Sequence, residues 1–379
     1  MNRKNINDII KSVLPVNSEV IGYPRKTAVM REYLKANPGS GTIKYLDRLD
    51  FSSGAAVDIP VFFKKTTFNI QRSNFIARLN GARVWGKNGA VIGAGDYFIT
   101  DVAREFNQGM NIAHSVYYTL IQVKSQYITG NTAVIGTAGA NIYYHWMIDV
   151  LPRLGLLSGI ISLGEIDHFI TQFSGLPFQN ETLKKTGISP EKIIASNNNR
   201  QFHVKAENLY VPSFAGALDQ PCAFQVDYLR NLFGNEMSTE TPYRYIYVSR
   251  AKTGRRKIVN ENELLNYLSG HGFEIIFAEE MTVAEQALLF STAKVIICSH
   301  GSALTNLVFC QKGTIVLDIF NSSHINSCFW FLSQVNQLDY HFMLGSPVDS
   351  DGNPKNDHTI VDPEVFKKAL SKIGLPINE

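Results

Sequence analysis

A histidine and an aspartate lie four residues apart in the otherwise apolar stretch NIYYHWMIDVLPRLGLL, residues 141–157. Residues at this spacing share one face of a helix, so His145 and Asp149 are expected to be neighbours. An imidazole beside a carboxylate can accept a proton from a hydroxyl group and so activate it as a nucleophile. A capping cluster or a buried ion pair without a chemical role is the alternative. This stretch alone leaves both interpretations open.

Pro152 interrupts the same helix. Proline has no N–H to donate to the carbonyl four residues back, so we expect the helix to be kinked or restarted near Leu151. Such a bend would turn Arg153, one helical turn beyond Asp149, away from the pair. An apolar stripe on another face of the helix predicts that this face is buried; its residues are Trp146, Val150, Leu154 and Leu157.

A second candidate site is the stretch KVIICSHGSALTNLVF, residues 294–309, a buried-strand run that leads through a tight turn into a short helix. The backbone N–H groups at a helix start are unpaired and carry partial positive charge, and Gly301 allows a ligand to come close. In open parallel sheets ligands bind beyond the carboxyl ends of the strands, where His300 and Ser302 are expected. We therefore expect a phosphate here, with an ordinary strand-to-helix turn as the alternative.

Basic residues gather in a third stretch, VSRAKTGRRK, residues 248–257. Arg250 closes a strand, and Arg255 and Arg256 lie in the loop that follows. Guanidinium groups at the end of a strand suit a pyrophosphate, because each offers several N–H donors in a planar fork. The loop lacks the interleaved aromatic residues of a nucleic-acid surface. A solvated basic loop is the alternative.

Composition limits the classes of protein. The chain has 379 residues, which favours two domains, and its 36 basic and 33 acidic residues give no general case for a nucleic-acid or anionic-membrane partner. The four cysteines are far apart, which predicts reduced, buried thiols. No stretch approaches the roughly 18 apolar residues of a membrane span, and the N-terminus lacks the apolar core of a secretory signal. We expect a cytoplasmic protein, with peripheral association at the inner face of the cell membrane left open.

The order of secondary structure predicts two α/β layers. Turn signals predict a small antiparallel meander over about 55–103, with hairpins at Asn80-Gly81 and Asn88-Gly89, and an α/β layer over about 115–233. The polar stretch 234–243 is expected to be a linker. Four buried-strand runs follow, separated by helix-sized segments, and predict a parallel sheet; they are YIYVSR, FEIIFAE, KVIICSH and TIVLDIF. Glu285, three residues after Thr282, is expected to be a helix cap.

Four motifs, in this order, resemble glycosyltransferase family 61. They are N-x-Y-Y-H-W-x-x-D-x-L-P-R-L at 141–154, S-R-x-x-x-x-R-R-x-I-x-N-E at 249–261, E-x-M-T-V-A-E-Q ending at 286, and H-G-S-A-L-T-N at 300–306 with V-L-D at 316–318. One position departs from the family pattern, which has a second Gly or Ala after His-Gly where this chain has Ser302. The added hydroxyl either binds phosphate or only replaces a methyl group.

The resemblance implies an α/β fold of the GT-B type, with two Rossmann-like domains that face a cleft. It implies an N-terminal acceptor-side domain over 1–235, a C-terminal nucleotide-sugar-binding domain over 244–346, and a terminal loop and helix over 347–379. The implied activity is inverting transfer of a hexosyl or pentosyl group from a nucleotide sugar, with UDP as the expected nucleotide, to a hydroxyl of a glycan. Surface polysaccharide assembly is the expected setting. No metal or other cofactor is expected.

Roles for the candidate residues follow from the same resemblance. Asp149 is expected to be the general base and His145 its partner or an acceptor-binding residue, and these two roles could be exchanged. Asn141 and Arg153 are expected on the acceptor side. The donor-binding residues are expected to be Arg250, Arg255, Arg256, Glu280, His300, Gly301, Ser302, Asn306 and Asp318. Within that set, Asn306 either holds its helix or touches phosphate, and Glu280 and Asp318 either bind sugar hydroxyls or pair with arginines.

Two rivals come from other classes. A catalytically silent nucleotide- or glycan-binding protein would need the basic loop and the turn at Gly301, but not the His145–Asp149 pair. A metallohydrolase built on that pair would need a third ligand, and none lies at a recognisable spacing. The chain does contain Asp349-Ser350-Asp351, but its neighbours are turn formers, so we expect these carboxylates in a polar loop away from the donor.

Overall fold

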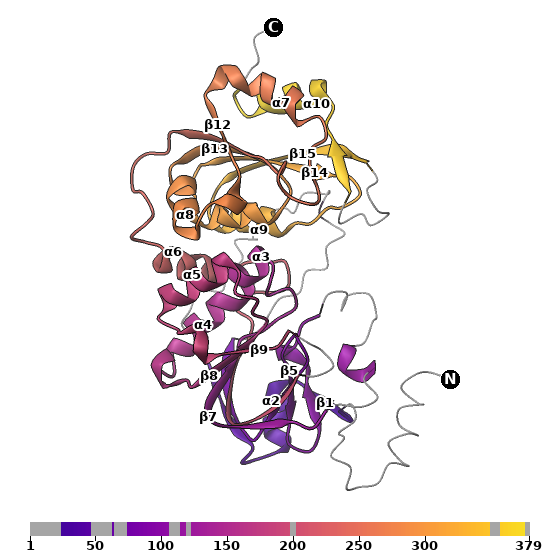
Figure 1. Ribbon diagram of the computed structural model, residues 1–379, viewed down its shortest axis with the longest axis vertical. Coiled ribbons are helices and arrows are strands. Elements are labelled where there is room, and N and C mark those ends of the chain that lie inside the picture. Colours follow the sequence, from indigo (N-terminus) through magenta and orange to yellow (C-terminus); the bar gives the residue numbers. More distant parts are fainter. Residues whose placement is uncertain are drawn as a thin grey trace, which may run out of the picture. The chain divides into compact units, whose positions relative to one another are not determined.

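The computed structural model describes residues 24–46, 63, 74–105, 114–118, 123–197, 202–348 and 357–375. The chain divides into two compact units. The N-terminal unit comprises Met1–Leu49 and Gln71–Ala215, and the C-terminal unit comprises Asp50–Ile70 and Gly216–Glu379. Each unit contains one β-sheet with helices packed against it (Figure 1). The fold is therefore mixed α/β, as the sequence predicts.

In the described residues of the N-terminal unit, ten strands form one sheet in the order β1-β6-β5-β4-β10-β7-β8-β9, and β3 pairs with both β2 and β10. The strands are β1 Lys26–Ala28, β2 Gly41–Tyr45, β3 Phe75–Asn80, β4 Arg83–Trp85, β5 Ala90–Gly93, β6 Tyr97–Ile99, β7 Gln126–Val134, β8 His168–Thr171, β9 Ile193–Ala195 and β10 His203–Pro212. Strands β10, β7, β8 and β9 are parallel. The chain adds β8 and β9 on one side of β7 and then returns to place β10 on the other, so the strand order reverses between β7 and β10.

The helical segments of this unit are short. They are α2 Met30–Ala36, η2 Thr100–Val102, η3 Ser115–Tyr118, α3 Tyr143–His145, η4 Trp146–Val150, α4 Leu151–Ser158, η5 Leu163–Glu165, α5 Pro177–Thr186 and η6 Pro190–Lys192. Helices α4 and α5 connect the parallel strands, α4 between β7 and β8 and α5 between β8 and β9. The residues around α4 are therefore carried to the carboxyl ends of these strands.

The meander is confirmed in part. Strands β4, β5 and β6 pair in antiparallel order, and Asn88-Gly89 lies in the hairpin turn between β4 and β5. The predicted hairpin at Asn80-Gly81 is wrong, because β3 and β4 both pair with the long strand β10. Gly81 has φ 62° and donates its N–H to the carbonyl of Glu207. Strands β3 and β4 pair with β10 in the same register on either side of it, so Asn-Gly lies within a nearly continuous strand. A positive φ at glycine is compatible with this position and with a hairpin turn, and the sequence of the dipeptide cannot distinguish them.

The earlier part of the predicted meander, before Asn74, lies outside the described residues except for Phe63. That residue is buried in the C-terminal unit. Its ring packs against Phe320 and Trp330, with centroid distances of 6.1 and 5.9 Å. Phe63 thus belongs to an aromatic cluster that the sequence did not indicate.

In the described residues of the C-terminal unit, six strands form the second sheet in the order β12-β11-β13-β14-β15-β16. The strands are β11 Arg244–Val248, β12 Phe273–Ile276, β13 Ala293–Ser299, β14 Ile315–Asn321, β15 Asp339–Val348 and β16 His358–Ile360. The first five in this order are parallel, and β16 is antiparallel to β15. The four strands predicted from buried runs are confirmed as β11 to β14, whereas the sequence did not show β15.

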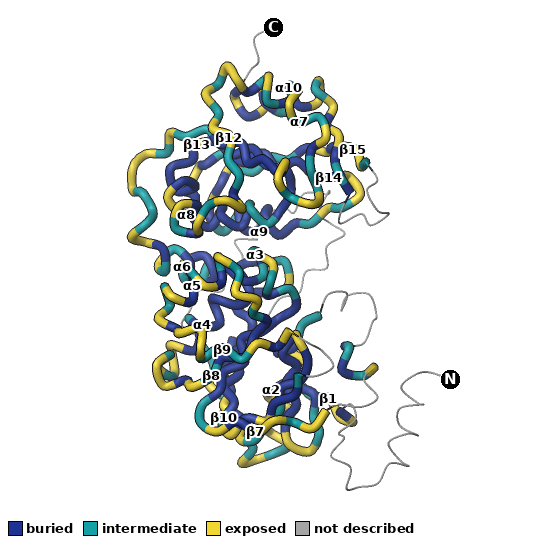
Figure 2. Tube along the Cα trace, viewed as in Figure 1, coloured by how far each residue is buried: buried dark blue, intermediate teal, exposed yellow. Residues whose placement is uncertain are grey.

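Helices cover both faces of this second sheet. They are α6 Ala223–Leu232, α7 Glu261–Leu268, η7 Ser269–His271, η8 Ala278–Glu280, α8 Val283–Ser291, η9 Ser302–Phe309, α9 Cys328–Val335 and α10 Pro363–Lys372. In Figure 1, α7 and α10 lie on one face of the sheet and α8 and α9 on the other. Figure 2 shows the strands buried between them. Burial on both faces explains why the central strands β13 and β14 read as nearly continuous apolar runs.

Smaller predictions can be checked in the same way. Thr282 caps α8 and forms a reciprocal pair of hydrogen bonds with Glu285, which confirms Glu285 as a cap. All four cysteines are free and buried, as expected. Among the described residues, no helix has both the length and the apolar character needed to span a membrane. The N-terminal residues examined for a signal sequence lie outside the described residues.

Candidate active site

The helix that carries the predicted pair changes its winding along its length. It begins as α3, widens into the π-helical turn η4, and continues as α4 from Leu151. Pro152 lies in the first turn of α4, where a missing N–H is tolerated, and the π-turn absorbs the change in hydrogen bonding. The expected restart near Leu151 is therefore confirmed. The apolar stripe is buried as predicted.

His145 and Asp149 are in direct contact. The distance from His145 Nδ1 to Asp149 Oδ2 is 2.7 Å. The carboxylate can only accept, so Nδ1 is the donor, and a neutral His145 carries its lone pair on Nε2. The two side chains are 12% and 5% exposed, respectively. The histidine is therefore the more accessible member of the pair.

Arg104 approaches the other oxygen of the carboxylate. Its Nη1 lies 3.4 Å from Asp149 Oδ1, and its guanidinium carbon lies 3.7 Å from the centre of the Phe214 ring. Arg104 precedes Asp149 by 45 residues and follows β6, so no spacing in the sequence connects it with the pair. Sequence analysis missed both Arg104 and Phe214.

Arg153 is fully buried behind this group. Its Nη1 donates to the carbonyl of Gly136 at 2.8 Å, and its Nη2 donates to the carbonyl of Pro212 at 2.6 Å. These two carbonyls lie just after β7 and at the end of β10, the neighbouring strands between which the strand order reverses. Burial lowers the pKa of Arg153 to about 9, and the charge of Arg104 lowers it further, whereas Asp149 opposes the change. The pair thus lies at the position where open α/β sheets bind ligands.

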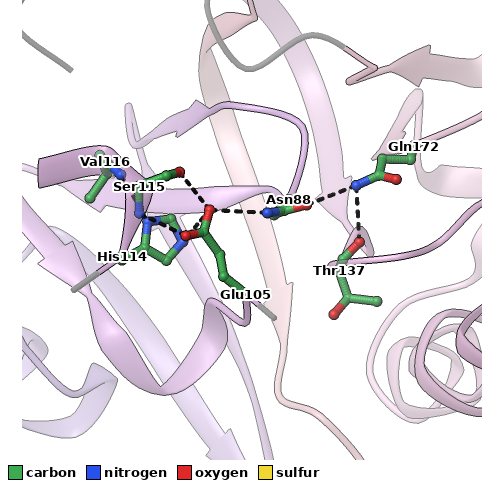
Figure 3. A network of polar contacts seen from close by, with 7 residues as sticks. All are labelled: Asn88, Glu105, His114, Ser115, Val116, Thr137 and Gln172. Carbon is green, nitrogen blue, oxygen red and sulfur yellow. Dashed lines mark hydrogen bonds and ion pairs between the residues drawn. The ribbon is translucent and has the colours of Figure 1, made fainter. Parts of the chain in front are cut away.

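A network of polar contacts ties the loop after β6 to these strand ends (Figure 3). Glu105, next to Arg104 in sequence, accepts from the backbone N–H of Ser115 at 2.7 Å and from the side-chain amide of Asn88 at 3.0 Å. Gln172, just after β8, donates to Asn88 Oδ1 at 2.8 Å. The network therefore anchors the backbone from which Arg104 projects.

His114 completes this network as a neutral group. Its Nδ1 accepts from the N–H of Val116 at 3.1 Å, so its proton is on Nε2, which lies 3.5 Å from Glu105 Oε1. Burial lowers the pKa of His114 to about 4, although Glu105 acts in the opposite direction. Asn141, predicted on the acceptor side, accepts from Gln179 Nε2 at 3.0 Å.

In the C-terminal unit the strand order reverses between β11 and β13. Arg250 follows the carboxyl end of β11, and Gly301 follows that of β13. An added Cβ on Gly301 would overlap the guanidinium group of Arg250. Gly301 has an extended backbone, with φ 179°, so glycine is needed here for space and not for conformation. The two predicted donor-site stretches therefore meet at the second such strand reversal.

Arg250, Arg255 and Arg256 form a cationic cluster at this point, which we call the arginine loop. Arg250 is 9% exposed and donates from Nη2 to the carbonyl of Arg255 at 3.2 Å. The Nε atoms of Arg250 and Arg256 are buried without a hydrogen-bond partner in the described part of the chain. Burial lowers the pKa of both side chains, that of Arg256 to about 10, and neighbouring arginines lower it further. A bound anion would accept hydrogen bonds from these unsatisfied N–H groups and would offset the repulsion between the guanidinium charges.

His300 is held by a buried carboxylate. Its Nδ1 lies 2.9 Å from Asp318 Oδ2, which also accepts from Tyr340 at 2.7 Å. The ring of His300 stacks on Phe320 with a centroid distance of 4.3 Å. Asp318 is fully buried, and its observed partners are His300 and Tyr340. Burial, together with the negative charge of Asp318, raises the pKa of Tyr340.

The remaining predicted residues have simpler surroundings. Glu280 pairs with Lys252 at 2.7 Å, and both side chains are about half exposed. Asn306 is fully buried and donates to Gln286 on α8 at 2.6 Å, a contact that fits the helix-holding alternative. Ser302 begins η9 and is partly exposed. The functional roles of these residues stay predictions.

The structure thus groups the predicted residues by unit. The pair, Asn141 and Arg153 lie together in the N-terminal unit, and the arginine loop, Gly301, His300 and Asp318 lie together in the C-terminal unit. In the ranges that the structure describes, no group of three or more His, Cys, Asp or Glu side chains could hold a metal ion. Asp349 and Asp351 lie outside those ranges.

In a comparison with known proteins, one protein family matches part of the chain. The family model "Glycosyltransferase 61" matches residues 143–317, which include the pair, the arginine loop and the turn at Gly301. No curated protein matches the chain. Among solved structures, the chain is similar to the flavodiiron protein from Giardia intestinalis, with 12% identity and a TM-score of 0.22 over 52% of this chain and 46% of that one, so it spans less than half of that protein. The match over residues 143–317, just under half of the chain, supports glycosyltransferase family 61.

Proposed function

We propose that this glycosyltransferase moves a sugar from a UDP-sugar to a hydroxyl of a glycan acceptor, with inversion at the anomeric carbon and without a metal ion. The family match indicates glycosyl transfer, and the nucleotide, the inversion and the metal independence are our additions. The observation that carries the proposal is the buried contact between His145 and Asp149, because inversion by direct attack requires one well-placed base.

In this proposal His145 is the general base and Asp149 orients it. The sequence left these roles interchangeable, and two contacts and a difference in exposure favour this assignment. Both carboxylate oxygens of Asp149 are engaged, one by His145 and one by Arg104, and Asp149 is the less exposed of the two. The carboxylate fixes Nδ1–H, which leaves Nε2 to accept the proton of the attacking hydroxyl.

The arginine loop stabilises the leaving group. As the acceptor oxygen bonds to the anomeric carbon, the bond from that carbon to the donor phosphate breaks, and the electron pair leaves with the diphosphate. Arg250, Arg255 and Arg256, together with backbone N–H groups after Gly301, offset its negative charge. His300, oriented by Asp318, adds a donor at Nε2 when it is protonated. Unsatisfied guanidinium N–H groups support this assignment.

Several wider assignments rest on the family resemblance. We assign the two units to a GT-B arrangement, with the N-terminal unit as the acceptor-side domain and the C-terminal unit as the donor domain, which ends in the extension 347–379. Glu280 and Ser302 are assigned to the donor, and Asn141 to the acceptor side. The proposed setting is surface polysaccharide assembly at the cytoplasmic face of the membrane.

The experiment begins with a thermal-shift screen of purified protein against nucleotide sugars, followed by a transfer assay with the donors that bind. We expect transfer by the wild type, and a fall in turnover of roughly 10²–10⁴-fold in His145→Gln. Asp149→Asn should lower turnover without changing donor affinity. Donor binding without transfer or hydrolysis would instead identify a silent binding protein. Normal turnover in both variants would remove the pair from catalysis.

A further inference from the structure

We propose that Arg104 is a positioning residue that holds the Asp149 carboxylate, and through it His145, in the orientation that a base requires. The inference rests on the proposed base role of His145. It goes beyond the family match, which begins at residue 143 and does not include Arg104. Its basis is the contact between Arg104 Nη1 and Asp149 Oδ1 at 3.4 Å, on the side of the carboxylate opposite to the one that meets His145.

The position of Arg104 is defined by an aromatic ring. The guanidinium carbons of Arg104 and Arg153 lie 3.7 and 4.7 Å from the centre of the Phe214 ring. Cations are attracted to the electron-rich face of such a ring, more so when water is excluded. The Arg104 side chain is only 15% exposed, so the ring and Asp149 together restrict where its N–H groups point. Phe214 follows β10, which fixes the ring to the sheet.

The charges around the pair explain why a second cation is needed. Asp149 is 5% exposed, and burial alone favours the protonated, neutral form of a carboxyl group. Arg153 interacts electrostatically with Asp149, but its guanidinium donates to the carbonyls of Gly136 and Pro212. Arg104 donates directly to the carboxylate. The ring of Tyr144 also faces the pair, edge-on and 5.1 Å from the centre of the His145 ring.

The ionised carboxylate in turn determines the state of His145. It holds the proton on Nδ1 and directs Nε2 away, which is the tautomer a base requires. Removing the Arg104 guanidinium should loosen the pair, because Asp149 Oδ1 loses the donor that contacts it and the carboxylate is free to turn. The Nδ1–H group of His145 is then held less firmly, and Nε2 is less well oriented as a base.

The backbone of Arg104 is itself anchored. Its neighbour Glu105 accepts from Ser115 and Asn88, and the network in Figure 3 continues to Gln172 beyond β8. A loop held in this way can support a side chain that must stay in one place. Glu105 is therefore expected to act through Arg104, and with a weaker effect.

The test compares Arg104→Met, which removes the charge, with Arg104→Lys, which keeps a charge without the planar fork. Arg78→Met is the matched control, because Arg78 is an exposed arginine of the same sheet that bonds to Asn208. The first readout is the tautomer of the His145 ring, read by NMR from its ¹⁵N chemical shifts and assigned with His145→Gln. In Arg104→Met we expect a smaller share of the Nδ1–H tautomer than in the wild type, a smaller change in Arg104→Lys, and none in Arg78→Met.

The second readout is the kinetics of transfer. We expect kcat at neutral pH to fall roughly 10²-fold in Arg104→Met, with an unchanged KM for the donor and partial rescue in Arg104→Lys. A wild-type His145 tautomer in folded Arg104→Met would overturn the inference. If Arg104→Met does not fold, a wild-type tautomer and wild-type turnover in Arg104→Lys would overturn it. Because NMR needs no substrate, failure to find any transfer would count against the proposed function alone.

Discussion

The close contact between Gly301 and Arg250 predicts that even a methyl side chain at residue 301 weakens diphosphate binding strongly. In Gly301→Ala the new Cβ would occupy the space of the Arg250 guanidinium, so this group must move. The extended backbone at Gly301 is open to any residue, so the substitution introduces no conformational strain. Any loss of diphosphate binding therefore reports the displacement of Arg250.

The magnitude follows from what Arg250 is expected to donate. A hydrogen bond between a charged donor and acceptor contributes about 1.5–3 kcal/mol, which corresponds to a roughly 10- to 150-fold increase in Kd. Overpacking of a buried contact also costs about 1–3 kcal/mol of folding stability. Arg250→Ala should weaken binding to a similar extent. In a protein that already carries Arg250→Ala, Gly301→Ala should weaken UDP binding little further, because the guanidinium group that the new Cβ would displace is absent.

Calorimetric titration with UDP and with uridine measures the affinity for the nucleoside diphosphate and for the nucleoside separately. Gly254→Ala is the matched control, since Gly254 lies in the arginine loop and an added Cβ there meets no atom within 4 Å. We expect UDP affinity to fall in Gly301→Ala, uridine affinity to change little, and Gly254→Ala to behave as the wild type. Unchanged UDP binding in folded Gly301→Ala would refute the reasoning, as would equal losses for UDP and uridine.

Further predictions concern charge, pH and metal. Arg255→Ala should weaken UDP binding more than uridine binding, and equal losses in the same titration would mean a structural role. Since burial lowers the pKa of His114 to about 4, below its ordinary value near 6.5, the unfolded chain binds a proton first as the pH falls. Stability should therefore drop by about 3 kcal/mol between pH 6.5 and 4, and urea unfolding of His114→Asn should show a shallower drop. Transfer should persist in excess chelator and after Asp349 and Asp351 are both changed to Ala; loss in both tests would contradict the metal-free proposal. Tyr340→Phe should weaken UDP binding modestly by loosening Asp318 behind His300, and a wild-type Kd would exclude such a role.

Short-range periodicity made part of this structure predictable. His145 and Asp149 are neighbours because four residues make about one helical turn, and this holds although the turn is π-helical. Strands β11, β13 and β14 were recognisable because burial leaves few polar residues in them. Strand β12 lies at the edge of the sheet with Glu274 and Ile275 exposed, and was recognisable from its Phe and Ile residues alone. The break near Leu151 follows from the chemistry of Pro152 alone.

The same reasoning could not predict contacts between residues far apart in the sequence. Arg104 meets Asp149 only because β6 and the loop after it share a sheet with β7, and no local pattern encodes that pairing. Tyr340 was missed because β15 is partly exposed and carries mixed polar and apolar residues, which hides the strand. Gly81 was assigned to a hairpin because Asn-Gly suits a tight turn, and nothing in the dipeptide shows that the chain continues along β10 instead.

The anomeric configuration of the product tests the central claim most directly. With a donor identified, the coupling constant of the anomeric proton in the first-formed product can be read by ¹H NMR, with excess chelator present. The account predicts a product of configuration opposite to that of the donor sugar, formed by the wild type and strongly reduced in His145→Gln. A product that retains the donor configuration would contradict direct attack by a hydroxyl that His145 activates.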